Sequence, residues 1–326
     1  MASYGAPQVR ALSLASYAFL SQPPQGFSEH PLLTPRGAMM VATPGQDQLL
    51  ADDWAASSQA TPHVRLLDMA QACALVPVLR PEKIIGAVFE PDAMDMDVHS
   101  IHQGYLRGIR RHGGQLMCDA QVTALQHSHG VWRVQAAGQT FEAPVVLNAA
   151  GAWADEVARL AGVRPVGLQP KRRSALTFAP PPGLLCSHWP MVASLDESWY
   201  MKPDAGMLLA SPANVDPVPP HDVQPEEMDI ALAIHRIEEM TTLQIRRPTR
   251  TWAGLRSFVA DGDLVGGFDP QVAGFFWVAA QGGYGIQTSA AMGMACAALA
   301  RGESLPEHLR QFGLTEAMLS PARLLK

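Results

Sequence analysis

The sequence predicts an α/β fold, mixed with α+β character, in which two domains are interwoven. One observation is an apolar run at 275–280 that passes through a glycine turn into a small-residue helix at 289–301. Another is the strand pattern 145–151, which is followed by a helical pattern at 153–161. Strands that alternate with helices indicate a parallel sheet. From 172 to 212, short strands punctuated by proline and glycine replace this alternation and indicate a sheet-rich second domain.

The first part of the chain alternates helices with short strands. Residues 7–21 carry apolar side chains at helical spacing and end before Pro23-Pro24. Asp97 is a helix cap, and Gly113-Gly114 closes the helix that follows it. We therefore expect helices at 47–59, 68–76 and 98–112 and strands at 37–42, 84–89 and 115–118.

The rest of the chain predicts a hairpin, a set of short strands and one long helix. The expected strands are 131–137, 140–143, 174–178, 191–194, 199–202, 207–210 and 252–258. Pro225 opens the helix, which runs through Met240 with isoleucines at helical spacing.

Composition narrows the class of protein. The 326 residues are 48% hydrophobic and carry a formal net charge of −6 without a basic stripe, which argues against a nucleic-acid partner. The four cysteines form no C-x-x-C pair, so we expect free thiols in a reducing compartment and a cytoplasmic protein. No apolar run reaches the roughly 18 residues of a transmembrane helix.

The turn Gly282–Thr288 is the most informative stretch. It lies between a strand and a helix, a layout that directs free backbone N–H groups and the positive end of the helix dipole at a ligand. No Gly-x-Gly-x-x-Gly occurs anywhere in the chain. The sequence therefore contains the back half of a dinucleotide site without the phosphate-binding front half.

Long segments of the chain resemble one family. The stretches VVLNAAGAWADEVARLAGVRPVGLQPKRRSALTF and AAQGGYGIQTSAAMG resemble the flavin-dependent D-amino acid oxidases and dehydrogenases. The segments YGAPQVRAL, HQGYLRGIRR and TWAGLRSFVADGDLV are most similar to bacterial D-arginine dehydrogenases, in the same order. The resemblance covers the chain from about Tyr4 onward.

The resemblance implies an incomplete Rossmann-like FAD-binding domain. The family's Gly-x-Gly-x-x-Gly turn, which holds the FAD pyrophosphate, precedes the residue that matches Met1. We therefore expect a gene start placed at an internal methionine, or alternatively a shortened protein. The expected FAD-binding domain comprises 1–35, 91–160 and 255–326, and the expected substrate-binding domain comprises 36–90 and 161–254.

The resemblance also implies cofactor contacts. The turn residues Gly282, Gly283, Tyr284, Gly285, Ile286 and Gln287 would face the pyrimidine edge of the flavin. Val122 would contact the adenine side through its backbone, and Ala150 and Gly151 would lie near the cofactor. The alternative for the turn is a glycine-rich bend required only for tight packing.

The implied small-molecule substrate is a D-amino acid, which carries a carboxylate and an amine on one carbon. Arg256 and Tyr200 would bind its carboxylate, since a planar guanidinium can donate two parallel hydrogen bonds. The alternatives are an arginine at a strand edge and a tyrosine in the core. Arg173 matches a third polar contact, although a basic run is usually a solvated face, and Tyr4 matches a tyrosine that covers the substrate. The Gly283 carbonyl and the Gln287 side chain would also touch the substrate.

The implied reaction is hydride transfer from the substrate α-carbon to flavin N5. The imine would then hydrolyse to a 2-keto acid and ammonia, and the electrons would pass to an acceptor, quinone-like or other. No residue is assigned as an acid or base, and no metal site is expected. Asp95, Asp97, His99 and His102 are expected in cap and helix-surface roles.

One departure from the family bears on specificity. Arginine-preferring relatives carry a glutamate at the position of Ala38, so we expect apolar or aromatic D-amino acids to be favoured over D-arginine. Two alternatives stay open: an oxidase of glycine or sarcosine-like amines, and a flavin-free chain that acts only in binding or is inactive.

Overall fold

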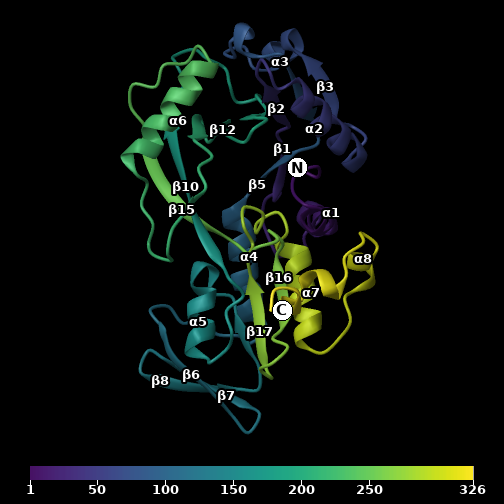
Figure 1. The fold of residues 1–326 in the computed structure, drawn as a ribbon, viewed down its shortest axis with the longest axis vertical. Coiled ribbons are helices and arrows are strands. Elements are labelled where there is room, and N and C mark those ends of the chain that lie inside the picture. The colour runs from purple at the N-terminus through teal and green to yellow at the C-terminus, as the bar shows by residue number, and fades with distance from the viewer. Residues whose placement is uncertain (326) are drawn as a thin grey trace. The chain divides into compact units, whose positions relative to one another are not determined.

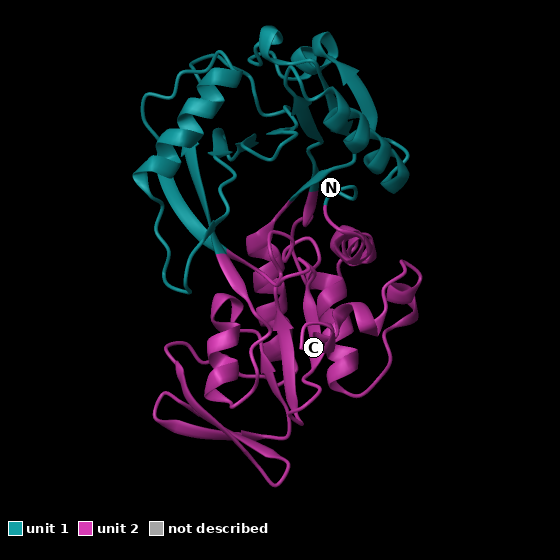
Figure 2. Cartoon of the chain, viewed as in Figure 1, with its two compact units in different colours: residues 1–4, 34–95, 171–255 teal, residues 5–33, 96–170, 256–326 magenta. Residues whose placement is uncertain are grey.

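The computed structural model describes residues 1–325, and these form two compact units (Figure 2). The sequence-based domain limits fall at 35/36, 90/91, 160/161 and 254/255, and the units divide at 33/34, 95/96, 170/171 and 255/256, with residues 1–4 in unit 1. Unit 1 comprises 1–4, 34–95 and 171–255, and unit 2 comprises 5–33, 96–170 and 256–326.

Unit 1 is built on a mostly antiparallel sheet. Its strands lie in the order β14-β10-β13-β12-β11-β2-β4-β3, and β15 pairs with β10. The strands are β2 (Ala38–Ala42), β3 (Arg65–Asp68), β4 (Gly86–Glu90), β10 (Gln169–Phe178), β11 (Met191–Ser194), β12 (Tyr200–Asp204), β13 (Met207–Ser211), β14 (Asp216–Pro217) and β15 (Arg250–Phe258). The helices of the unit are α2 (Asp47–Ala60), α3 (Met69–Leu75), η1 (Pro81–Lys83) and α6 (Glu227–Met240).

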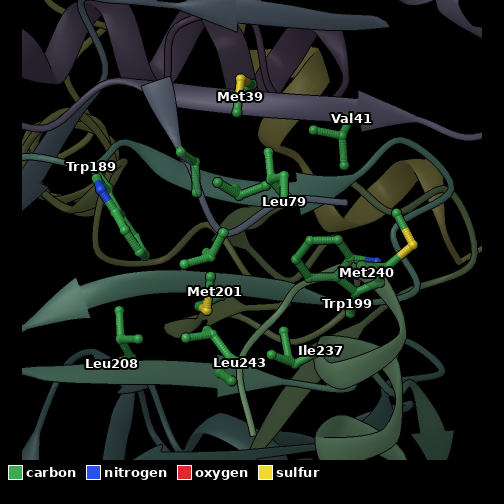
Figure 3. Close-up of a cluster of buried hydrophobic side chains, with 14 of the residues drawn as sticks. Met39, Val41, Leu79, Trp189, Trp199, Met201, Leu208, Ile237, Met240 and Leu243 are labelled. Carbon is green, nitrogen blue, oxygen red and sulfur yellow. The ribbon is translucent and has the colours of Figure 1, made fainter. Parts of the chain in front are cut away.

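One face of this sheet carries the core of unit 1. Side chains alternate between the two faces of a strand, and Met39, Val192 and Met201 are register partners in neighbouring strands. All three are almost fully buried in one cluster that also contains residues of α6 such as Ile237 and Met240 (Figure 3). The residues between them along each strand therefore face the opposite side of the sheet.

Unit 2 contains a smaller sheet, β16-β17-β9, that is covered on both faces. The strands are β9 (Val146–Asn148), β16 (Val265–Phe268) and β17 (Phe275–Ala279), with β17 and β9 parallel. Phe276 packs into a cluster with residues of α1 (Pro7–Ser21) and α7 (Ser289–Ala300). Phe275 and Trp277 pack into a second cluster with residues of α5 (Ala154–Leu160). Burial on both faces explains the continuous apolar run that the sequence shows here.

The remaining elements of unit 2 surround this sheet (Figure 1). The helices are α1 (Pro7–Ser21), α4 (Val98–Arg111), η2 (Gly151–Trp153), α5 (Ala154–Leu160), α7 (Ser289–Ala300), α8 (Glu307–Arg310), α9 (Glu316–Leu319) and η3 (Pro321–Arg323). A separate antiparallel sheet is formed by β6 (Val122–Ser128), β7 (Val131–Ala136) and β8 (Gln139–Ala143). The short strands β1 (Leu33–Pro35) and β5 (Met94–Met96) pair where the chain passes from one unit to the other.

The mixed α/β class is confirmed, and one expected strand is wrong. Residues 115–118 form no strand, and the side chains of Leu116 and Met117 are 51% and 42% exposed. A strand forms only where a neighbour satisfies its N–H and C=O groups, and none pairs with this segment among the described residues. Asp97 caps α4 as expected, since its carboxylate accepts a hydrogen bond of 2.8 Å from the Ser100 N–H.

Candidate functional site

Two strand ends of unit 2 bring most of the predicted cofactor residues to one edge. Because β9 and β17 are parallel and Trp277 pairs with Asn148, their carboxyl ends lie side by side. The buried Asn148 side chain donates 2.7 Å to the Ala154 carbonyl and accepts 3.3 Å from the Ala150 N–H. Gly151 follows with a positive φ of 57° and open space where a Cβ would be. The turns after the two strands therefore form adjacent parts of one edge.

The glycine turn after β17 is only partly open to a ligand. The N–H groups of Tyr284, Thr288 and Ser289 already donate to carbonyls within the turn. Among the described residues, the N–H groups of the others have no backbone acceptor: Gly283, Gly285, Ile286 and Gln287. The sequence predicts free N–H groups throughout the turn, and the structure confines them to this set.

Arg256 lies against this turn and has unpartnered nitrogens. The Gly282 N–H donates 2.9 Å to the carbonyl of Ser257, which fixes the turn against β15. A Cβ on Gly283 would lie 2.3 Å from Nη2 of Arg256, so only glycine leaves room for the guanidinium. Among the described residues, Arg256 Nε and Nη1 are buried without a hydrogen-bond partner, and the guanidinium carbon lies 5.3 Å from the Phe258 ring centre. A cation with buried, unused donors is a site for an anionic group.

Gln287 ends the turn and is held by helix α1. Its Nε2 donates 2.8 Å to the Ser13 hydroxyl oxygen. The first turn of α7 is also held by α1, because the Ala291 N–H donates 3.0 Å to the buried Ser16 hydroxyl. Neither serine was singled out from the sequence, since nothing in a helical serine predicts a partner more than 270 residues away.

In unit 1, three predicted residues share one face of the large sheet. Tyr200 pairs with Ala193, which pairs with Met40 in β2, and Ala38 lies two residues before Met40. Arg172 and Arg173 are adjacent in β10, so their side chains point to opposite faces of the sheet. The Arg172 side chain bonds Asp229 of α6 on the core side. Arg173 therefore faces the same side as Tyr200 and Ala38, and its Nε donates 2.8 Å to the Asn214 carbonyl. An apolar cluster covers part of this face.

Glu90 is a residue of this face that the sequence analysis missed. It is the register partner of Ala38 and is only 3% exposed. Its carboxylate accepts hydrogen bonds of 2.6 Å from the Ala2 N–H and of 3.3 Å and 2.5 Å from the Ser3 N–H and hydroxyl. The bonds hold the segment that leads into Tyr4. A glutamate at the end of an otherwise apolar strand is the signal that could have identified it.

The remaining predicted residue, Val122, begins β6. Its side chain is half-buried and packs against the cluster that contains Trp132 and Phe275. Among residues 1–325, no helix combines the length and the apolar character that crossing a bilayer requires.

Comparison with known proteins identifies the family. The family model described as FAD dependent oxidoreductase (DAO) matches residues 1–299. Mitochondrial dimethylglycine dehydrogenase from Mus musculus is 26% identical over 167 residues, which is 51% of this chain and 19% of that protein. FAD-dependent oxidoreductase domain-containing protein 1 from Xenopus laevis is 28% identical over 183 residues, 49% of this chain and 35% of that protein. The matched part is thus about a fifth to a third of the length of these relatives.

Solved structures show the same fold at low identity. L-proline dehydrogenase from P. horikoshii superposes with a TM-score of 0.81 at 16% identity, covering 100% of this chain and 85% of that one. Glycine oxidase from Geobacillus kaustophilus superposes with a TM-score of 0.79 at 20% identity, covering 96% and 84%. Because the family model spans most of the sequence, the chain belongs to the DAO family of FAD-dependent oxidoreductases, whose cofactor is FAD.

Proposed function

We propose that the chain takes part in the FAD-dependent oxidative deamination of D-amino acids with apolar side chains. The observation that supports it is Arg256, whose Nε and Nη1 are buried beside the glycine turn without partners. Leaving buried donors unsatisfied costs about 1–3 kcal/mol each, and a carboxylate at one edge of the guanidinium would accept from one of them in parallel with Nη2. An amino acid carboxylate is the anion that fits an amine-oxidising family.

The residues present fit the ring end of FAD. The N–H groups of Gly283, Gly285, Ile286 and Gln287, which have no backbone acceptor among the described residues, and the open space at Gly151 lie on one sheet edge, where an aromatic ring with carbonyl oxygens can approach the backbone. When bound, FAD accepts the hydride from the substrate α-carbon. The chain's own groups then have to bind the carboxylate, orient the α-carbon and exclude water.

The sheet face of unit 1 supports the choice of side chain. Ala38 is buried, its register partners are Met191 and Glu90, and Met40 follows it on the same face of its own strand. The Glu90 carboxylate is already bonded to Ala2 and Ser3, so the other groups beside Ala38 are small or thioether side chains. Methionine adapts to ligands of varied shape. No carboxylate stands at position 38 to accept a guanidinium. Tyr200 and Arg173 are the polar groups that we assign to the substrate carboxylate on this face, and Tyr4 is assigned as its cover.

A second candidate is the oxidation of glycine or N-methylated amines. The mitochondrial relative named dimethylglycine dehydrogenase and the structural neighbour named glycine oxidase favour this class. Both reactions need the same carboxylate-binding arginine, so the size of the substrate side chain separates them.

The test is a flavin titration followed by a substrate panel. The purified chain is incubated with FAD and desalted, and bound flavin is measured by its visible absorbance. Anaerobic bleaching is then followed with D-Met, D-Phe, D-Arg, L-Met, glycine and sarcosine. Bleaching by D-Met and D-Phe supports the proposal, bleaching by glycine or sarcosine alone supports the second candidate, and a strong D-Arg preference contradicts the assigned specificity. Reoxidation by O₂ compared with a quinone identifies the electron acceptor.

A further inference from the structure

Helix α1 presents two serines to the turn and helix that carry the proposed cofactor contacts. Ser13 and Ser16 are three residues apart and so lie on one face of α1. The Ser16 hydroxyl accepts a hydrogen bond from the Ala291 N–H and so satisfies one of the backbone donors that lack an intrahelical partner at the start of α7. Ser13 instead meets a side chain, the amide of Gln287.

The position of the Ser13 hydroxyl proton follows from its other partner. Ser13 Oγ lies 2.7 Å from the carbonyl oxygen of Val9, one helical turn earlier. A carbonyl oxygen only accepts hydrogen bonds, so the hydroxyl proton is used on Val9. The hydroxyl oxygen then has only lone pairs for Gln287, and the nitrogen of the Gln287 amide must face Ser13 at 2.8 Å.

This arrangement fixes which end of the Gln287 amide is available to a ligand. With Nε2 held by Ser13, the carbonyl Oε1 faces away from α1 and is a hydrogen-bond acceptor. Arg256, packed on Gly283 of the same turn, offers only donors. The turn therefore combines a cationic donor with a neutral acceptor.

We infer that Ser13 is a positioning residue that orients Gln287 so that Oε1 accepts a hydrogen bond from an N–H group of the ligand. The N–H belongs either to the substrate amino group or to the imide of the flavin ring. This inference rests on the proposed function, since it assigns the polarity of one contact in the same site.

The matched variants are Ser13→Thr and Ser13→Val, which have nearly the same shape. Threonine keeps the hydroxyl and its bond to the helix carbonyl one turn back, whereas valine removes both. Without Ser13 the amide of Gln287 can rotate, and we expect the affinity for the N–H ligand to fall about 3-fold to 10-fold. The threonine variant should stay within twofold of wild type. In a Gln287→Met background, Ser13→Val should have no further effect.

Three measurements separate the outcomes: the FAD dissociation constant, KM for D-Met, and the midpoint of thermal unfolding. If Ser13→Val raises only the FAD dissociation constant, the N–H belongs to the flavin. If it raises only KM for D-Met, the N–H belongs to the substrate amine. Equal losses in the threonine and valine variants, or a lower midpoint with both constants unchanged, would overturn the inference.

A further readout does not depend on flavin or turnover. The side-chain amide signal of Gln287 in a ¹⁵N spectrum is identified by its loss in Gln287→Met. Ser13→Val should shift that signal and Ser13→Thr should leave it in place. An unshifted signal would show that the contact is not made. Failure of the proposed function would instead appear as wild-type protein that neither binds FAD nor oxidises D-Met.

Discussion

Replacing Gly283 by alanine gives the most direct test of how the glycine turn shapes the anion site. A Cβ at this position would lie 2.3 Å from Arg256 Nη2 and 2.7 Å from both Cζ and Nε. Nonbonded atoms normally stay about 3.5 Å apart, so the guanidinium must retreat by about 1 Å. The backbone of Gly283 needs no left-handed conformation, and the effect should therefore come from this collision alone.

The expected loss follows from the hydrogen bonds that the displaced guanidinium can no longer make. A hydrogen bond to a charged group contributes about 1.5–3 kcal/mol. Losing one of a parallel pair to a carboxylate therefore weakens binding about 10-fold to 150-fold. We expect KM for D-Met and the inhibition constants of simple carboxylates such as benzoate to rise together by this factor.

The control is Gly254→Ala in the same strand as Arg256. A Cβ there would meet nothing within 4 Å, so KM and the inhibition constants should stay at the wild-type values. Steady-state kinetics and carboxylate inhibition of both variants, with thermal unfolding, complete the assay. Unchanged carboxylate affinity in a stably folded Gly283→Ala protein would refute the assignment of Arg256 as the anion-binding group.

Three further predictions concern specificity, pH and thiol chemistry. Ala38→Glu should raise D-Arg turnover relative to D-Met only when it is combined with Glu90→Gln. In the Ala38→Glu single variant, two buried carboxylates would stand opposite each other in the sheet, so its thermal unfolding midpoint should be lower than that of wild type. Burial opposes ionisation of Asp95, but hydrogen bonds from two basic side chains outweigh it and hold its pKa below the ordinary value. Its contribution to stability is therefore present at neutral pH and falls as the pH drops from about 4 through the lowered pKa. Asp95→Asn should cost about 1.5–3 kcal/mol at pH 7 and progressively less below about pH 4 by urea unfolding. Burial raises the pKa of Cys296 to about 12, so this thiol should react slowly at pH 8. A thiol reagent should label the exposed Cys118 first, and fast labelling of Cys296 would contradict its buried position.

The sequence by itself determined the α/β class and the local signals that start and end its elements. The helix capped by Asp97 and the glycine turn between the apolar run and α7 were predictable because caps, turns and periodic apolar residues act over a few neighbouring residues. The prediction of a strand at 115–118 was wrong because strand formation depends on distant residues. Its apolar residues satisfy a local pattern, but a strand also needs a neighbour, and pairing is not a local property.

Tertiary structure alone decided which of several similar side chains face the site. Arg172 and Arg173 are adjacent and chemically identical, yet Arg172 is buried against Asp229 and Arg173 faces the side of Tyr200, because alternate residues of a strand point to opposite faces of a sheet. Glu90 and Ser13 gained their roles in the same way, through partners 87 and 274 residues away in the chain. The chemistry of each residue is written in the sequence, but its partner and direction depend on sheet register and helix packing, which are set by the whole fold.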